Sequence, residues 1–314
     1  MKLGTISHNG VDAVVAALDD GSAVLLNETM DDAPASMIAL IEGGASALQR
    51  VEQALRGRAG GGLSMDALQW RPPVPRPGKV ICVALNNSAN KDRIKSGPSH
   101  PAMFIKPGSS LIGHGQPIRL RADFGRVHPE PELVAVIGRG GSDIAPEHAL
   151  DHVFGYTIIN DLTSPTMRGE DTFHYRAIHP KAGDAGAIEY VDTWVSYPAR
   201  YKCSDSFGPM GPWIATRDAI ADPHDLTVRC LHQGELVTED NTANLFYKVR
   251  DVVAFASTYM TLEPGDAIAM GTALKAAGSG AGRAVQNIDL NKLGGPVQVS
   301  ISGIGTLSNP VQWR

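Results

Sequence analysis

The sequence predicts an α+β protein made mostly of strands, with mixed or antiparallel sheets and few helices. Two observations support this prediction. The 34 glycines and 21 prolines among the 314 residues indicate many turns, and aromatic residues are few at 6%. Apolar runs are mostly short and bounded by turn residues, which is typical of strands. The hydrophobic fraction of 43% is sufficient for a large core.

The charge and the cysteine content exclude several classes of protein. The formal net charge is −5 and no basic tract occurs, so nucleic acid and acidic membrane surfaces are not expected as partners. The cysteines, Cys82, Cys203 and Cys230, form no CxxC pattern, which argues against a disulfide framework or a structural zinc site. No leader-like segment opens the chain, and no apolar run approaches the roughly 20 residues that span a bilayer. We therefore expect a soluble, cytoplasmic protein.

Residues 1–75 are predicted to form a small N-terminal unit and its linker. Residues 1–30 contain short apolar runs between Asn-Gly and Asp-Gly turn signals, which predict a small β-meander. Apolar residues at three- to four-residue spacing predict a helix over 36–55, interrupted at Gly43-Gly44. The proline-rich run 70–78 is stiff and cannot be a central strand. We therefore place a domain boundary near residue 75.

The second unit, residues 76–314, is predicted to alternate strands with turns. Apolar runs predict strands at 79–85, from Leu133, at 155–161, near 213–216 and within 262–272, a hairpin at 226–237, a strand pair at 296–309, and helices at 146–153 and 249–260. Residues 162–201 show weak periodicity and receive no assignment.

Two carboxylates stand at the start of one predicted strand. Glu130 and Glu132 precede the apolar run that begins at Leu133, and residues i and i+2 of an extended chain point to the same face. Carboxylates placed side by side repel each other, and core packing does not require them. A divalent cation such as Mg²⁺ or Mn²⁺ prefers oxygen ligands and would remove this repulsion. The alternative is a pair of strand-end carboxylates that face solvent.

Several runs together resemble the fumarylacetoacetate hydrolase family. Its metal motif is a Glu-x-Glu at the start of a strand, completed by a later aspartate, and Glu130, Glu132 and Asp161 fit it. The family's lysine precedes a Phe…Pro-x-Gly-Pro-Trp run, and Lys202 before residues 207–213 is similar. The resemblance covers roughly residues 78–312, with further similar stretches at 104–107, 241–244, 260–266 and 303–310.

The resemblance implies a β-roll fold with mixed sheets, a small N-terminal α+β domain, a homodimer, and chemistry on dicarbonyl acids. It implies that Glu130, Glu132 and Asp161 hold Mg²⁺ or Mn²⁺, with Ca²⁺ as a third option. It also implies a catalytic role for Lys202, which would stabilise a developing enolate or bind a carboxylate as a point charge. An exposed lysine in a loop is the alternative. Three carboxylates leave part of a cation's coordination shell open for a bidentate dicarbonyl group.

The usual water-activating pair of the family is missing. Members that hydrolyse C–C bonds usually carry a histidine and, three residues on, a glutamate after the first strand, and those places hold Asn90 and Arg93. The family's arginine and glutamine after the metal aspartate fall on Pro165 and Arg168. Thr272 is followed by alanine where the family usually has proline.

A replacement base is predicted within residues 168–179. His174 and His179 are the catalytic candidates, because an imidazole titrates near neutral pH and can act as a general base. Glu170 and Asp171 compete with them. For each of these residues, an ordinary position in a surface loop is the alternative.

Four residues are predicted to bind substrate. The guanidinium fork of Arg168 matches the geometry of a carboxylate, and a solvated loop position is its alternative. Asn87 and Asn90 can contact substrate or hold a water molecule, but an amide cannot act as a base. Thr272 follows the late strand of the second unit and completes the set.

The leading prediction is a divalent-metal-dependent hydrolase that cleaves a C–C bond in an acylpyruvate-like or other β-dicarbonyl acid. Decarboxylation or tautomerisation of a 2-oxo acid on the same metal site is the alternative, and the missing water-activating pair favours it because neither reaction needs activated water. A hydratase on the same site is a further alternative. A non-catalytic ligand-binding protein is the second alternative.

Overall fold

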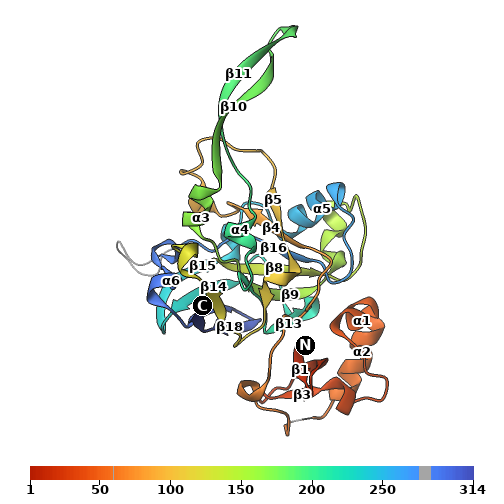
Figure 1. Ribbon diagram of the computed structural model, residues 1–314. Helices are drawn as coiled ribbons and strands as arrows, with labels where there is room; N and C mark the ends of the chain where they lie inside the picture. Colours follow the sequence, from red (N-terminus) through yellow and green to blue (C-terminus); the bar gives the residue numbers. More distant parts are fainter. Residues whose placement is uncertain (59, 276–283) are drawn as a thin grey trace.

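A nine-stranded sheet runs through the protein. The computed structural model describes residues 1–58, 60–275 and 284–314 (Figure 1). Most neighbouring strands of the sheet are antiparallel, but β16 pairs in parallel with β4. Its strands, in spatial order, are β3 (Ala23–Leu25), β2 (Val11–Ala17), β1 (Lys2–His8), β13 (Trp213–Thr216), β9 (Val153–Asn160), β8 (Pro131–Ile137), β16 (Ala267–Ala269), β4 (Val80–Ala84) and β5 (Ala102–Lys106).

Smaller sheets complete the strand-rich architecture. The four-stranded sheet shares the larger hydrophobic core with β8 and β9, and its order is β15 (Glu235–Asn241), β14 (Thr227–His232), β17 (Val297–Ile301) and β18 (Gly305–Asn309). Three two-stranded sheets pair β12 (Gly208–Pro209) with β6 (Leu111–Ile112), β19 (Val311–Trp313) with β7 (Ile118–Leu120), and β10 (Thr172–Lys181) with β11 (Asp184–Ser196). The predicted mostly-β fold with mixed sheets and few helices is confirmed.

The helices are short. They are α1 (Met37–Glu42), α2 (Gly44–Leu55), α3 (Pro165–Glu170), α4 (Arg200–Cys203), α5 (Val249–Tyr259) and α6 (Leu290–Leu293). The helix predicted over 36–55 is divided at the predicted glycine pair, because Gly44 adopts φ +57°, which a right-handed helix does not allow. The helix predicted at 249–260 is α5, whereas residues 146–152 form a 3₁₀ helix.

Strand β8 lies at the centre of the fold and positions the predicted metal ligands. It pairs with β9 on one side and β16 on the other, and all seven of its residues are buried. Leu133 and Ala135 enter one hydrophobic core, while Val134 and Val136 enter the core on the other face. Glu132 continues the row of Val134 and Val136, so the register of the strand fixes where its carboxylate points.

The N-terminal strands extend the same sheet. Strand β1 pairs with β13 through Lys2↔Ala215 and Gly4↔Trp213, and the indole rings of Trp70 and Trp213 meet edge to face at 4.6 Å. Side chains from both predicted units also share one core. The domain boundary near residue 75 therefore stays a prediction. The hydrogen-bonded ladder between β1 and β13 joins strands from both sides of this boundary.

The segment that the sequence left unassigned contains a long hairpin. Strands β10 and β11 pair with each other alone among the described strands. Figure 1 shows this hairpin, residues 172–196, projecting from the body of the protein, between α3 and α4. We call it the arm. No helix of the described residues is long and apolar enough to cross a membrane.

Candidate metal centre and active site

Two neighbouring strands bring the three predicted metal ligands together. Glu130 directly precedes β8, Glu132 is the second residue of β8, and Asp161 directly follows β9, its antiparallel partner. The Asp161 N–H donates to the carbonyl of Glu130 at 2.8 Å, and the Glu130 N–H donates to Asn160 Oδ1 at 2.8 Å. One oxygen of each carboxylate lies within 4.8 Å of the others. The geometry therefore assembles the triad expected from the sequence.

Two buried lysines partly balance this negative charge. Lys202 Nζ lies 2.6 Å from Glu130 Oε2 and 2.5 Å from Asp161 Oδ2. Lys106 Nζ lies 2.9 Å from Asp161 Oδ1 and also donates to the carbonyls of Lys202 and Phe207. Three carboxylates thus face two ammonium groups, which leaves one negative charge without a counterpart.

The pKa values of the cluster follow this imbalance. Burial raises the pKa of Glu132 to about 8, and the neighbouring Asp161 adds to the effect. Burial also opposes the charge on Asp161, but Lys106 and Lys202 outweigh it and hold the pKa of Asp161 below its ordinary value. For Lys202, burial is outweighed by the surrounding carboxylates, which raise its pKa above the usual range. Lys202 is therefore a fixed cation.

A divalent cation fits this site. The oxygen donors match the preference of Mg²⁺ and Mn²⁺, and a cation would stabilise the charged form of Glu132, which burial and the neighbouring Asp161 disfavour. The Thr272 hydroxyl donates to Glu130 Oε2 at 3.2 Å and to Glu132 Oε1 at 3.0 Å, and the Gly271 N–H donates to Glu132 Oε2 at 2.9 Å. These contacts orient the carboxylates as outer-shell partners of metal sites do.

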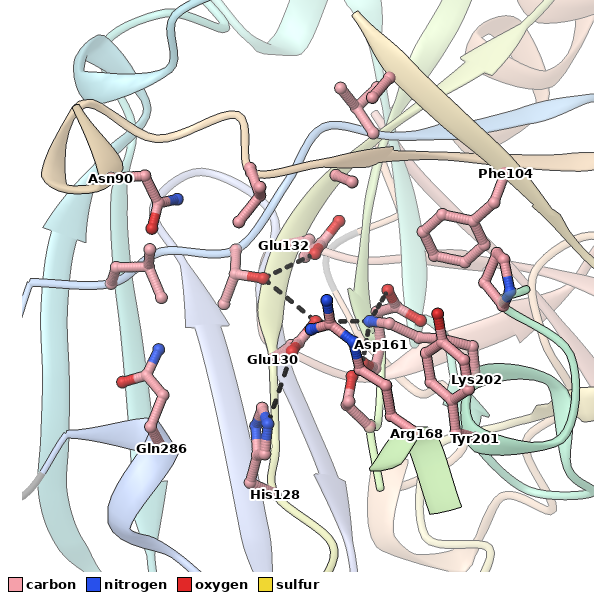
Figure 2. Close-up of a pocket in the computed structure, with 18 of the residues that line it drawn as sticks. Asn90, Phe104, His128, Glu130, Glu132, Asp161, Arg168, Tyr201, Lys202 and Gln286 are labelled. Atoms are coloured by element: carbon pink, nitrogen blue, oxygen red, sulfur yellow. Dashed lines mark hydrogen bonds and ion pairs between the residues drawn. The ribbon is translucent and has the colours of Figure 1, made fainter. Parts of the chain in front are cut away.

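A cavity of about 370 Å³ opens onto the triad. Figure 2 shows Asn90 and Gln286 on one side of the carboxylates, and Phe104, Tyr201 and Lys202 on the other. This volume suits a small organic acid.

The structure brings most of the predicted site residues to this cavity. Asn90, Arg168, Lys202 and Thr272 all line it. Asn87 lies beneath the surface instead, where its amide donates to Asp240 Oδ2 at 2.9 Å and to the carbonyl of Thr272 at 3.2 Å. Asn87 therefore holds the loop of Thr272 in place and does not face the cavity.

The two histidines predicted as bases do not line the cavity of their own chain. His174 and His179 lie exposed on β10 of the projecting hairpin, and the His174 ring stacks on Trp194 at 4.0 Å. The competing Glu170 and Asp171 form ion pairs with Arg200 at 2.5 Å and 2.8 Å. The expectation was wrong about position, because the chain leaves the cavity after α3 and returns only before α4.

Two residues that sequence reasoning did not assign contribute to the site. His128 is buried and lines the cavity, with its Nε2 atom 3.7 Å from Glu130 Oε1. The position of His128 could be predicted from the sequence, because His128, Glu130 and Glu132 stand at i, i+2 and i+4 of one extended run and therefore share a face. Lys106 is fully buried within a stretch that resembles the family, but nothing in the sequence distinguished it from a surface lysine.

Comparison with protein families matches residues 79–312 to the family described as fumarylacetoacetate (FAA) hydrolase C-terminal. The chain belongs to the fumarylacetoacetate hydrolase family. An oxaloacetate tautomerase (fahd2, mitochondrial) of Xenopus laevis is 32% identical over 93% of this chain and 83% of its own length. Its human counterpart, oxaloacetate tautomerase FAHD2A, is 30% identical over 93% and 84%.

Solved structures of the family have the same fold. A maleylpyruvate hydrolase from Sphingobium sp. SYK-6, solved with manganese(II) and pyruvate, has a TM-score of 0.72 and 26% identity over 100% of this chain and 99% of its own. The fumarylacetoacetate hydrolase of Exiguobacterium antarcticum has a TM-score of 0.74 and 28% identity over 100% of both chains. The named relatives are thus enzymes whose reactions differ.

The raised pKa of Glu132 predicts how pH acts on the metal-free protein. Between its ordinary value of 4.5 and about 8, the folded state keeps a proton on Glu132 that the unfolded chain releases. The free energy of unfolding should therefore fall as pH rises through this window. Mn²⁺ must displace the same proton, so its affinity should rise over the same window. Denaturant titration in chelator and calorimetry with Mn²⁺ measure the two effects.

Glu132→Gln should reduce this pH dependence of stability and weaken Mn²⁺ binding, since the amide has no proton to release and no charge to offer. Glu147→Gln, at an exposed glutamate, is the matched control. If the free energy of unfolding depended equally on pH, and Mn²⁺ bound equally well, in the wild type and both variants, Glu132 would not be the titrating metal ligand.

Proposed function

We propose that the protein is a metal-dependent enzyme that interconverts the enol and keto forms of a 2-oxo dicarboxylic acid such as oxaloacetate. The observation that most supports this proposal is which side chains surround the triad. Asn90 and Arg93 stand where a water-activating pair would be needed, and neither accepts a proton at neutral pH. The cavity therefore holds the means to stabilise an enolate without a dedicated pair to activate water.

The bound cation would be held by Glu130, Glu132 and Asp161 and would supply Lewis-acid polarisation of the 2-oxo group. Lys202 places a permanent positive charge beside Glu130 and Asp161, where it stabilises negative charge on the substrate oxygen. Lys106 holds the carbonyl of Lys202 from below, so the ammonium group of Lys202 is fixed in position.

His128 is positioned to move the proton. Among the described residues that line the cavity it is the one imidazole, and Nε2 faces Glu130 at the metal end. In the keto-to-enol direction, Nε2 takes a proton from C3 of the substrate and the C3 electron pair forms the C2–C3 double bond. The imidazolium then returns this proton to the 2-oxo oxygen. The reverse sequence restores the keto form, so the reaction needs no other reactant.

Arg168 provides a site for the second carboxylate of the substrate. It extends from α3 at the cavity, and its guanidinium group makes no hydrogen bond or ion pair with any described residue. Arg93 also lines the cavity, and its one side-chain bond is to Asn90 Oδ1 at 3.3 Å. A carboxylate would give either guanidinium a charged partner with matching geometry. This favours a diacid over a monocarboxylic acid.

The relatives support this proposal, because the two oxaloacetate tautomerases cover most of the chain at 30–32% identity. C–C bond hydrolysis is the second candidate, favoured by the similarity to the maleylpyruvate hydrolase that was solved in complex with manganese(II) and pyruvate.

Incubation with oxaloacetate and Mn²⁺ tests the proposal. We expect faster disappearance of the ultraviolet absorbance of the enol, above the spontaneous rate, without release of CO₂. Pyruvate released together with CO₂ would indicate decarboxylation instead. Cleavage of maleylpyruvate to pyruvate without enol turnover would identify the hydrolase, and a protein inert to both acids would contradict the enzymatic proposal.

His128→Gln should lower kcat for enol turnover by about 100-fold, the low end for a lost general acid–base group. Mn²⁺ affinity should stay unchanged, because the three carboxylates are intact. His148→Gln, at an exposed histidine, is the control. Wild-type kcat in His128→Gln would remove this residue from the mechanism.

Arg168→Gln should raise KM for oxaloacetate by about 10- to 100-fold, the expected cost of a lost hydrogen bond between charged groups. The enol of phenylpyruvate, which has no second carboxylate, should be turned over as before. Arg250→Gln replaces an exposed arginine of α5 as a control. An equal increase in KM for both acids would show that Arg168 does not bind the second carboxylate.

A further inference from the structure

Asp240 is a buried carboxylate that the proposed reaction does not use. It is the second-last residue of β15, is 5% exposed and does not line the cavity. It forms no ion pair with any residue that the structure describes, so hydrogen bonds alone support its charge. A buried charge of this kind is costly unless hydrogen bonds replace the lost water. The position of Asp240 therefore requires an explanation.

One oxygen of Asp240 holds the segment that lines the metal end of the cavity. Oδ2 accepts hydrogen bonds from the Asn87 amide at 2.9 Å and from the backbone N–H groups of Leu274 and Lys275 at 2.8 Å and 3.2 Å. Leu274 lines the cavity, as does Thr272. The Asn87 amide also donates to the carbonyl of Thr272 at 3.2 Å. The segment that begins at Thr272 is thus tied to Asp240 at both of its ends.

The other oxygen is held by residues that do not line the cavity. Oδ1 accepts the backbone N–H of Asn241 at 2.8 Å and the Asn244 amide at 2.6 Å. Burial opposes the charge on Asp240, but the hydrogen bonds outweigh it and hold the pKa of this carboxyl below its ordinary value. Asp240 is therefore ionised, and all five of its hydrogen-bond partners named here are donors.

The segment that Asp240 holds makes direct contact with two metal ligands. The Thr272 hydroxyl donates to Glu130 Oε2 at 3.2 Å and to Glu132 Oε1 at 3.0 Å, and the Gly271 N–H donates to Glu132 Oε2 at 2.9 Å. A continuous path of hydrogen bonds therefore leads from Asp240 to both glutamates. Groups that orient metal ligands in this way set the affinity of the site.

We propose that Asp240 is a positioning residue of the metal centre. Its charge fixes residues 271–275, so that the Thr272 hydroxyl and the Gly271 N–H aim the two glutamates at the cation. An uncharged side chain of the same shape cannot replace it. An asparagine amide would turn its NH₂ group toward other donors on one side or the other. The alternative is that Asp240 only stabilises the fold.

Calorimetry with Mn²⁺, well below the unfolding temperature, separates these two roles. Asp240→Asn should weaken Mn²⁺ affinity about 10-fold, the low end of the cost when a partner of a metal ligand is lost. Asn244→Ala is the matched control, because it removes a hydrogen bond to the same carboxylate on the Oδ1 side. It should lower the free energy of unfolding and leave Mn²⁺ affinity unchanged.

Asn87→Ala tests the same path with the carboxylate intact, and it serves also if Asp240→Asn does not fold. It removes one Oδ2 partner and the bond to the Thr272 carbonyl, so Mn²⁺ affinity should again fall.

A double-mutant cycle tests whether Asp240 acts through Thr272. Thr272→Val alone should weaken Mn²⁺ binding, because it removes the hydroxyl that contacts both glutamates. Combined with Asp240→Asn, the loss of affinity should be smaller than the product of the two single losses, since both changes remove the same contacts.

Amide hydrogen exchange in chelator tests the path without metal. The amides of residues 272–275 should exchange faster in Asp240→Asn than in the wild type, because their local opening becomes easier. They should be unchanged in Asn244→Ala.

Three results would overturn the inference: wild-type Mn²⁺ affinity in both Asp240→Asn and Asn87→Ala, an equal loss in Asn244→Ala, or fully multiplicative losses in the cycle. The first of these, together with reduced stability, would leave Asp240 a stabilising role alone. None of these measurements depends on which reaction the enzyme catalyses.

Discussion

The excess negative charge of three carboxylates, two of them buried, is the constraint on which the site depends. Glu132 and Asp161 are almost completely buried, and the antiparallel register of β8 and β9 prevents them from moving apart. Such a cluster is costly unless it is neutralised. Lys202 and Lys106 supply part of the counter-charge, and the remaining deficit selects a cation with oxygen preference. Metal binding and folding of the site are therefore linked.

The side chains at the open side of the cavity then determine which reaction a bound cation can support. Arg93 and Arg168 line the cavity, are exposed and place cationic groups at its open side. Positive charge there favours the binding of an anion over the activation of water. Relatives in the family include a hydrolase and tautomerases, and we attribute such differences in chemistry to side chains outside the triad.

The metal triad was predictable from sequence because the signal is local. Glu130 and Glu132 share a face by the two-residue period of a strand, and the resemblance added Asp161. His128 belongs to the same two-residue period, which predicts its position beside the two glutamates but not its role. Lys106 was not predictable, since its burial results from contacts with residues about a hundred positions away. The arm also escaped prediction, because both of its faces mix apolar and polar residues, which removes the alternation that identifies a half-buried strand.

The arm and the cavity are connected through one geometric requirement. The side chains of Asp161 and Lys202 are in contact in the site, so the 40 residues between them must leave the body of the protein and return to it at nearly the same place. The Ser164 N–H closes this point by donating to the carbonyl of Tyr201 at 3.0 Å. An antiparallel hairpin is the simplest excursion with coincident ends. Arg168 and Lys202 lie on the two helices at its base and line the cavity, so anything that anchors the arm would also restrain these two residues.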